Sequence, residues 1–270
     1  MHNYNIIPVI FYKFFFFQKL RVISVIHTDI NYIKKKFLNK FLVKIIFCFS
    51  NKIIFVNSIP SDFKNSIFKE KFSVIFNGVN TRKLKKNNYK KIKNKTIYMG
   101  MASRIDYGKR HDLLLKITSL LKKKNIKLKL LIAGDGKLLK FYKLQTKKLN
   151  LGNYISFLGD LNENNLIKFY KKLDFYIHLS DNEYKSISIL QAMSFGLPIL
   201  ASKINNNYFI KAVSSSNYLI KNNDKEIYKL VLLLIKKNKI NYNSKNRHYI
   251  INNCNQKKML EKYYMTLWQY

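Results

Sequence analysis

Two groups of polar side chains in this sequence could act on an anionic substrate. Arg104 and Lys109 stand five residues apart, between a short apolar run and a segment with helical spacing. A guanidinium, an ammonium and the free N–H groups at the start of a helix all attract phosphate oxygens, so this pair could bind a phosphorylated ligand. Basic residues near a helix start are common in a lysine-rich chain, and for Lys109 alone a solvated loop explains the sequence equally simply.

The second group follows the apolar run 175–179. Glu183 lies four residues after the end of this run, and Gln191 lies about one and a half turns into the helix expected over 187–195. Gly196 is the expected carboxyl-terminal cap of that helix. Glu183 could contact a substrate, but on spacing alone a carboxylate that caps the helix is an equally good explanation.

The elements that carry these residues alternate between strands and helices. All eight glycines fall between Gly78 and Gly196, and several follow short apolar runs. This alternation predicts a parallel sheet with helices on both faces, and such sheets bind ligands at the carboxyl ends of their strands. The expected strands are 96–99 (ended by Gly100), 128–133, 155–158, 175–179, 198–201 and 218–220, and the expected helices are 111–124, 138–149, 163–173 and 187–195.

The first eighty residues show the same alternation less completely. Residues 81–95 are polar and rich in lysine, which is typical of a linker. We therefore expect a partial α/β domain over 1–80, a nucleotide-binding domain over 81–250 and a closing helical segment over 251–270. The expected elements of the first part are strands at 21–27, 52–56 and 73–76 and helices at 33–49 and 60–68.

Composition narrows the class of protein. The net charge is +37, but hydrophobic residues make up 47% of the chain, which excludes a disordered polyelectrolyte. Two cysteines exclude a disulfide scaffold and a multi-cysteine zinc site. Only five of the 51 basic residues are arginine, so we expect solvated lysines and no specific nucleic-acid partner. Attraction to an anionic membrane stays open, although the apolar run 4–17 is too short to span a bilayer.

Several short motifs occur in an order that resembles one known family. The residues are Phe76–Asn80 (FNGVN), Arg104 with Lys109, Ile132–Gly136 (IAGDG), Tyr170 with Asp174 and Phe175, Glu183, and Ala192–Pro198 (AMSFGLP). Together they resemble the retaining glycosyltransferases of family 4, which have the two-domain GT-B fold. The helix over 256–268 resembles the last helix of that family, which returns to the amino-terminal domain.

The resemblance implies a function and a set of site residues. A nucleoside diphosphate sugar would be the donor, and Arg104 and Lys109 would neutralise the departing diphosphate without a metal ion or other cofactor. Glu183 would orient hydroxyls of the sugar and, with His27, form the catalytic pair. Gln191 would bind the nucleotide ribose. The remaining donor-site residues implied are Gly100, Ser186 and Ile187, whereas His111, His178 and His248 are expected to be structural.

The chain departs from the family pattern at three places. Gln191 replaces the second glutamate of the E-x₇-E motif, Tyr184 stands where glycine is usual, and no glycine precedes Gly78. The amino-terminal domain would therefore lack its first strands and glycine-rich loop. We predict a retaining transferase that acts on a cell-surface glycan or lipid-linked acceptor, in the cytoplasm at the inner face of the membrane. The alternatives are a split or inactive remnant that still binds the donor, and a basic module that binds membrane or nucleic acid.

Overall fold

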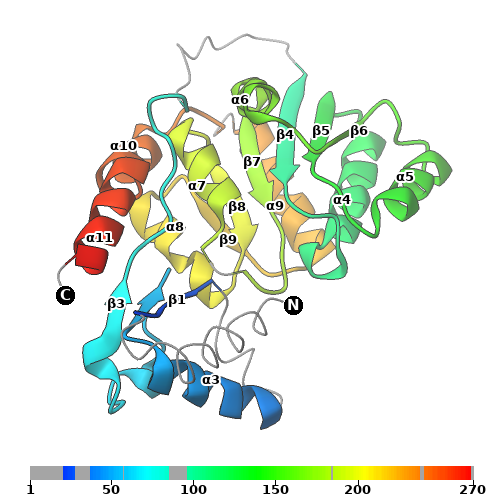
Figure 1. The fold of residues 1–270 in the computed structure, drawn as a ribbon. Helices are drawn as coiled ribbons and strands as arrows, with labels where there is room; N and C mark the ends of the chain where they lie inside the picture. The colour runs from blue at the N-terminus through cyan, green and yellow to red at the C-terminus, as the bar shows by residue number, and fades with distance from the viewer. Residues whose placement is uncertain are drawn as a thin grey trace. The chain divides into compact units, whose positions relative to one another are not determined.

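The computed structural model describes residues 21–27, 37–56, 58–84, 96–183, 185–237 and 240–268 (Figure 1). These residues form two compact units, the first made of residues 1–77 with 262–270 and the second of residues 78–261. Within the described residues, no helix combines the length and the apolar composition that crossing a bilayer requires. The expectations for residues 4–17, 33–36, 85–95 and Tyr184 lie outside the described residues.

The first unit contains a sheet of three parallel strands in the order β1-β2-β3. The bounds are Ile23–Ile26 for β1, Lys52–Phe55 for β2 and Phe72–Val74 for β3, and helix α3 spans Phe37–Phe49. Its core is aromatic, because the ring of Phe47 meets Phe72 edge-on at 5.2 Å between centroids and Phe72 meets Phe55 at 5.3 Å. All three strands were expected from the sequence.

The prediction of a helix over 60–68 is wrong. The structure has only two short 3-10 turns there, η1 at Ser61–Phe63 and η2 at Lys69–Lys71, and neither contains a buried residue. The Ser61 hydroxyl bonds to the neighbouring Asp62 side chain, so no side chain caps the first turn. Ile67 is 90% exposed, so the segment has no continuous apolar face that would stabilise a full helix.

The second unit contains a sheet of six parallel strands in the order β6-β5-β4-β7-β8-β9. Chain order therefore reverses between the two neighbouring strands β4 and β7, which pair through Met99 with Phe175 and Gly100 with Tyr176. The strand bounds are Ile97–Ala102 for β4, Leu128–Ala133 for β5, Ile155–Gly159 for β6, Phe175–His178 for β7, Ile199–Ser202 for β8 and Tyr218–Ile220 for β9.

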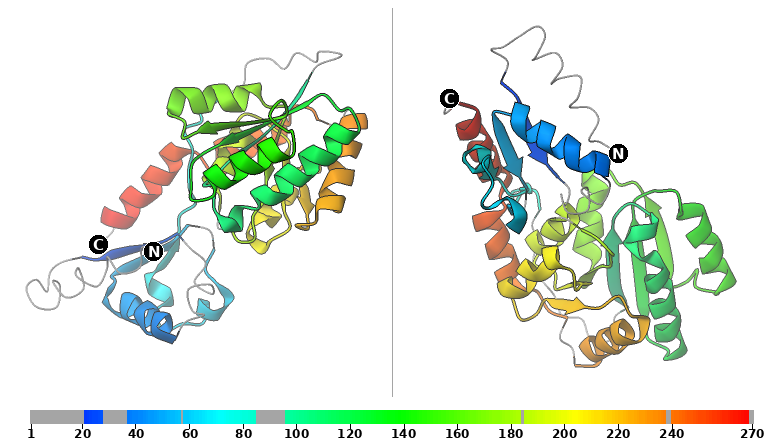
Figure 2. Two further views of the ribbon diagram at one scale, coloured as in Figure 1. Left: turned by 90° about the vertical axis from the view of Figure 1, so that its right-hand side faces the viewer. Right: turned by 90° about the horizontal axis from the view of Figure 1, so that it is seen from below.

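Helices cover both faces of this sheet, as the sequence predicts (Figures 1 and 2). On one face α4 packs beside α9, and their side chains share a core with Met99, Ile132 and Ile177. On the other face α7 packs beside α10 over Tyr176 and Ile199. The helix bounds are His111–Lys123 for α4, Leu139–Lys148 for α5, Glu163–Lys172 for α6, Ile187–Ser194 for α7, Tyr208–Val213 for α8, Asp224–Lys236 for α9, Ser244–Asn253 for α10 and Gln256–Trp268 for α11.

Two glycines are explained by packing. The sequence predicted that the strand ends at Gly100, but β4 continues to Ala102. A Cβ at Gly100 would lie 2.6 Å from the side chain of Leu173, so the glycine lets this leucine approach the sheet. Gly196 has φ +68° directly after the last turn of α7, which agrees with its expected role as a cap.

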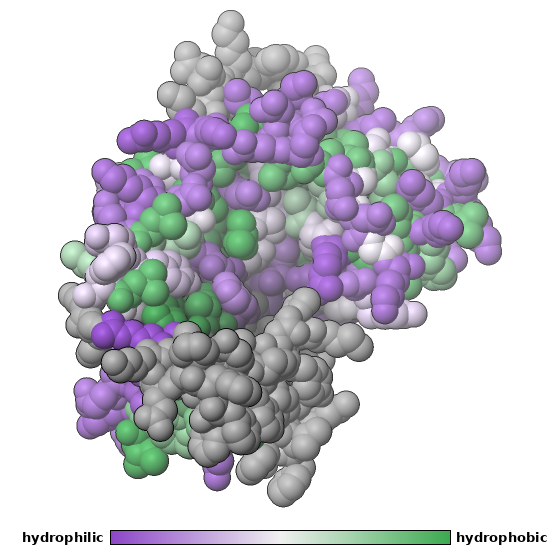
Figure 3. Space-filling model, viewed as in Figure 1, coloured by the Kyte–Doolittle hydropathy of each residue, from purple (hydrophilic) through white to green (hydrophobic). Residues whose placement is uncertain are grey.

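Hydrophilic residues are spread over the visible face of the second unit, with apolar residues between them (Figure 3). The five lysines 137, 140, 143, 147 and 148, on and beside α5, are all exposed. This distribution agrees with the interpretation of most lysines as solvated surface.

Candidate active site

The site lies where two loops leave adjacent strands at the point of reversed chain order. The loop after β4 carries Arg104 and Lys109, and the loop after β7 carries Glu183. Ligands of open parallel sheets bind in the crevice at such a switch point, outside the carboxyl ends of the strands. The sheet topology therefore brings the two predicted groups to one edge.

A glycine turn holds the loop after β4. Gly134 has φ +118°, and a Cβ there would lie 2.1 Å from the backbone oxygen of Ser103. The loop is tied to this turn by backbone bonds from Ser103 N to Ala133 O at 3.0 Å and from Ile105 N to Asp135 O at 2.8 Å. Only glycine lets the two loops approach this closely, which explains the IAGDG motif in physical terms.

Arg110 ties the two site loops together. Its guanidinium donates two 3.1 Å bonds to the carboxylate of Asp112 and a 3.0 Å bond to Asp181 in the loop after β7. The bonds to Asp112 and Asp181 raise the pKa of Arg110 against the effect of burial. Two further bonds end on the backbone oxygen of Gly108, from Asp181 N at 2.9 Å and from the Ser180 hydroxyl at 3.0 Å. Arg110 adopts φ +43°, and such strain in a non-glycine residue persists only where its surroundings fix it.

The carboxylate of Glu183 lies at the centre of this network. Its Oε2 accepts a 2.7 Å hydrogen bond from Nε2 of His178 and a hydrogen bond from the Nζ of Lys109. Its backbone oxygen accepts a 2.8 Å bond from the side chain of Asn206. Helix α7 begins at Ile187 with Ser186 as its N-cap. Glu183 therefore does not cap this helix, and its partners are side chains of the site.

The electrostatics keep this carboxylate ionised. Burial favours the neutral acid, but the hydrogen bond from His178 and the charge of Lys109 outweigh it and hold the pKa of Glu183 well below its usual range. Burial lowers the pKa of His178, so its imidazole is neutral near pH 7. The side chains of Lys109 and Glu183 keep 19% and 15% of their exposure, which leaves both accessible to a ligand.

Most of the other predicted donor-site residues lie on the loop after β4 and at helix α7. Arg104 is 81% exposed and pairs with Asp106 at 3.4 Å, so its guanidinium is on the surface of the loop that also carries Lys109. Gln191 accepts a 3.1 Å bond at Oε1 from the hydroxyl of Tyr170. Ser186 and Ile187 form the start of α7, where free backbone N–H groups occur.

Two of the predicted residues are not brought to this centre by any described contact. Gly100 lies inside β4, two residues before its end, and faces Leu173. His27 is exposed and follows β1 in the first unit. Their roles in donor binding and catalysis stay predictions.

The sequence analysis missed the contribution of His178 and Arg110. His178 was expected to be structural, yet it contacts the carboxylate of Glu183 directly. Its place as the last residue of an apolar strand, five residues before Glu183, was the available signal. Arg110 could have been recognised from the acidic Asp112 nearby, but its bond to Asp181 depends on the sheet order. Among the described residues, no group of three or more His, Cys, Asp or Glu side chains is arranged to hold a metal ion.

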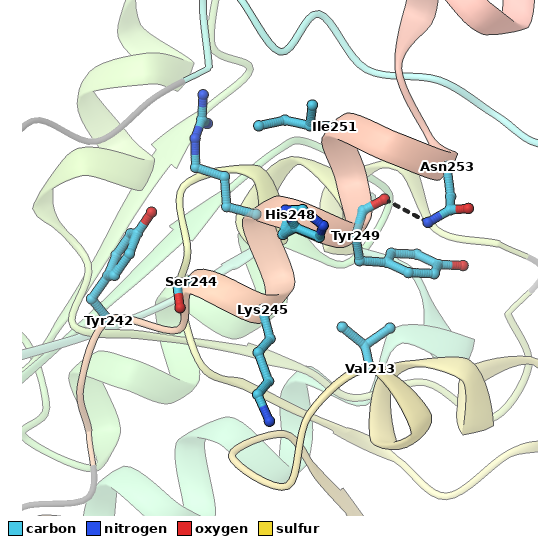
Figure 4. A pocket seen from close by; sticks show the side chains of 9 residues that line it. Val213, Tyr242, Ser244, Lys245, His248, Tyr249, Ile251 and Asn253 are labelled. Carbon is cyan, nitrogen blue, oxygen red and sulfur yellow. Dashed lines mark hydrogen bonds between the residues drawn. The ribbon is translucent and has the colours of Figure 1, made fainter.

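A separate pocket of about 630 Å³ lies over α10 (Figure 4). Its lining includes Tyr242, Lys245 and His248. Arg247 also lines the pocket, and its guanidinium donates hydrogen bonds to the backbone oxygens of Leu84 and Ser194. These bonds connect the segment that precedes β4 to the end of α7. None of the residues predicted for the donor site lines this pocket.

Comparisons with known proteins identify the relatives of the chain. The model of the family described as "Glycosyl transferases group 1" matches residues 82–257. Alpha-monoglucosyldiacylglycerol synthase of Streptococcus pneumoniae is 29% identical over 157 residues, which are 54% of this chain and 35% of that protein. The capsular polysaccharide biosynthesis glycosyltransferase CapH of Staphylococcus aureus is 28% identical over 181 residues, which are 64% of this chain and 48% of that protein. The chain therefore spans less than half the length of either relative.

Solved structures resemble the whole fold. HepE from Anabaena, in complex with UDP and glucose, has a TM-score of 0.80 at 16% identity, covering 98% of this chain and 75% of that chain. TarM has a TM-score of 0.72 at 22% identity, covering 96% of this chain and 53% of that chain. At these identities the likeness establishes the fold alone. It confirms the predicted GT-B-like α/β class with a Rossmann-like second unit.

Proposed function

The chain belongs to the family of glycosyl transferases group 1, and from this premise we propose that it transfers a sugar from a nucleoside diphosphate sugar to a glycan or lipid-linked acceptor. The transfer retains the configuration at the anomeric carbon. The observation that carries the proposal is the contact of Lys109 and Glu183 at the switch point of a six-stranded parallel sheet. A cation and an ionised carboxylate meet there at the edge where such sheets bind nucleotides.

The cations of the loop after β4 would bind the diphosphate. Lys109 donates one of its three ammonium protons to Glu183, which leaves two for phosphate oxygens. Arg104 is exposed on the same loop and could swing from Asp106 to a ligand, because its present ion pair is surface-accessible. Negative charge grows on the diphosphate as the bond to the sugar breaks. These two cations would stabilise that charge without a metal ion or another cofactor.

The carboxylate would orient the sugar. Both hydrogen bonds of the Glu183 carboxylate end on Oε2, so within the described residues Oε1 has no protein donor. Oε1 is thus the acceptor for a sugar hydroxyl. The start of α7, at Ser186 and Ile187, would place backbone N–H groups near the ligand phosphates. His27, which belongs to the first unit, would be the second catalytic residue.

Gln191 would contact the ribose of the nucleotide. Its Oε1 and the backbone oxygen of Ser188 each lie 3.1 Å from the hydroxyl of Tyr170 and share its one proton, which leaves the amide protons of Gln191 for other acceptors. A carboxamide can bond to ribose hydroxyls, but without the charge that strengthens such bonds in a carboxylate. We therefore expect donor binding that is weaker than a glutamate at this residue would give.

The acceptor class and the cellular location are inferred from the relatives and from the exposed lysines. The relatives are named for a glycolipid and for a capsular polysaccharide, which supports an acceptor of either kind. The exposed lysines favour association with an anionic membrane face, because each lysine near such a surface contributes about 1 kcal/mol. We place the activity in the cytoplasm, at the inner face of the cell membrane.

A thermal-shift panel followed by a transfer assay tests the function. Uridine, guanosine and adenosine diphosphate sugars are each added to the full chain, and a donor at a hundred times its dissociation constant should stabilise the fold by about 2.7 kcal/mol. Glu183→Ala should then abolish transfer of the sugar from the stabilising donor. A shift without transfer in the wild type would instead indicate an inactive nucleotide-sugar-binding remnant. No shift with any donor would favour the basic binding module.

A further inference from the structure

We propose that His178 is a positioning residue, whose Nε2–H bond fixes the Glu183 carboxylate so that Oε1 faces the donor sugar. The inference rests on the proposed function and adds a residue to its machinery. Nothing in the sequence assigned this histidine a role beyond packing.

The geometry of the carboxylate supports this role. Nε2 of His178 lies 2.7 Å from Oε2 of Glu183, and the side chain of His178 is 1% exposed. Lys109 donates to the same oxygen from the loop after β4. Two donors on one oxygen restrict rotation about the last side-chain bond of Glu183. The remaining oxygen is then presented in one orientation, which is what a sugar hydroxyl requires of an orienting group.

The tautomer of His178 follows from its partners. Glu183 is ionised, so it can only accept a proton in this bond, and Nε2 must carry the hydrogen. Nδ1 then carries no hydrogen, and it lies 3.4 Å from the oxygen of the Tyr176 hydroxyl. Because burial keeps the imidazole neutral, the bond orients the carboxylate without adding a second positive charge beside Lys109.

The histidine is anchored to the sheet. Tyr176 lies two residues earlier in β7, is fully buried, and its hydroxyl bonds to both N and O of Ala102 at 3.1 Å. Its ring stacks on that of His178 with 6.1 Å between centroids. The orientation of Glu183 is therefore coupled through His178 and Tyr176 to the last residue of β4. The loop that carries the cations begins directly after that residue.

The charged groups around His178 have opposing effects on its charge. Glu183 favours the protonated imidazole, whereas Lys109 and burial oppose it. His111, which faces the site from the start of α4, is itself neutral near pH 7 because burial lowers its pKa. In the wild type the carboxylate of Glu183 thus keeps its hydrogen-bond donor throughout the neutral range. Loss of this donor should raise the pKa of Glu183.

Two matched substitutions separate positioning from packing. His178→Gln can place an amide N–H near the location of Nε2, whereas His178→Asn is shorter and its amide reaches only to the location of Nδ1. Both are neutral and polar, so they disturb the buried site to a similar degree. His248→Asn, at an exposed histidine on α10, is the control for the loss of an imidazole elsewhere.

The experiment measures the affinities of UDP-glucose and UDP by calorimetry, between pH 5 and 8. If the thermal-shift panel selects another nucleotide, the guanosine or adenosine pair replaces these probes. We expect His178→Asn to weaken UDP-glucose binding about tenfold while UDP binding changes little, because the diphosphate contacts the cations and only the sugar contacts Glu183. His178→Gln should restore most of the affinity. The wild type should keep its UDP-glucose affinity over this whole range because Glu183 stays ionised, and any loss toward pH 5 should occur in His178→Asn alone.

Three results would overturn the inference. Equal UDP-glucose affinity in the wild type and His178→Asn would show that the bond does not orient the carboxylate. Equal losses for UDP and UDP-glucose in both variants would show a packing role alone. Nitrogen-15 spectra of the wild type without ligand should show His178 neutral with its proton on Nε2, and a proton on Nδ1 would also refute it. These spectra test the bond independently of the proposed function, which fails instead if the wild type binds neither UDP nor UDP-glucose.

Discussion

The turn at Gly134 offers a direct test of how the sequence builds the site. A methyl group at this residue would lie 2.1 Å from the backbone oxygen of Ser103, so one of the two loops must move by about an ångström. The residue also has φ +118°, and a side chain in that conformation costs about 1–3 kcal/mol. We expect Gly134→Ala to lower the melting temperature by about 2–4 °C for each kcal/mol lost.

The same substitution should weaken binding of the donor beyond its effect on stability. The loop that the added methyl group would displace begins at Ser103 and carries the two cations, so UDP affinity measured by calorimetry should fall well below that of the wild type at a temperature where both are folded. Gly152→Ala is the matched control, because a Cβ at Gly152 meets no atom within 4 Å. If Gly134→Ala is destabilised but binds UDP as the wild type does, the turn does not hold the diphosphate loop and the reasoning is refuted.

Three further predictions concern single side chains. Arg104→Ala should weaken UDP binding about tenfold in calorimetry. The melting temperature should not change, because the side chain of Arg104 is 81% exposed. Unchanged UDP affinity would show that Arg104 does not belong to the donor site. Gln191→Glu should strengthen UDP binding severalfold, since a carboxylate would still accept the Tyr170 proton and would bond more strongly to ribose; weaker binding would contradict the ribose assignment. Burial lowers the pKa of His111 from 6.5 to about 4, so the unfolded chain takes up this proton first and the free energy of unfolding should fall as pH drops from 6.5 to 4. Denaturant titrations should show that His111→Phe loses the part of this slope due to His111, up to about 3 kcal/mol, and an unchanged slope would show that His111 does not titrate in this way.

The sequence predicted the second unit well because its signals are local. Apolar runs that end near glycines mark buried parallel strands, and all six strands of the larger sheet were expected. The helices α8, α9 and α10 were not predicted. In α9 the buried side chains Ile227, Val231 and Leu234 have helical spacing. Leu233 lies among them but is exposed, so the apolar residues of the sequence do not mark a single face of a helix. The prediction of a helix over 60–68 failed for the opposite reason, since the two 3-10 turns there have no buried residue that would stabilise a helix.

The site was predictable only in part. Arg104 and Lys109 could be chosen because their types and their places after a strand match a phosphate-binding edge, whereas Glu183 was chosen on the resemblance to the family 4 glycosyltransferases. The pairing of His178 with Glu183 depends on the conformation of the loop after β7, which brings the carboxylate back to the last residue of that strand. The bond from Arg110 to Asp181 depends on β4 and β7 being neighbours, although 71 residues separate the two side chains. Such contacts are consequences of sheet order, which no local pattern encodes.

The proposed function requires that one site at the β4–β7 edge binds a nucleoside diphosphate sugar. A crystal structure of the full chain soaked with the donor selected by the thermal-shift panel tests this claim most directly. We predict that the diphosphate lies against the side chains of Lys109 and Arg104 and that a sugar hydroxyl donates to Oε1 of Glu183. A donor bound elsewhere, for example over α10, with the contact of Lys109 and Glu183 undisturbed, would contradict the account.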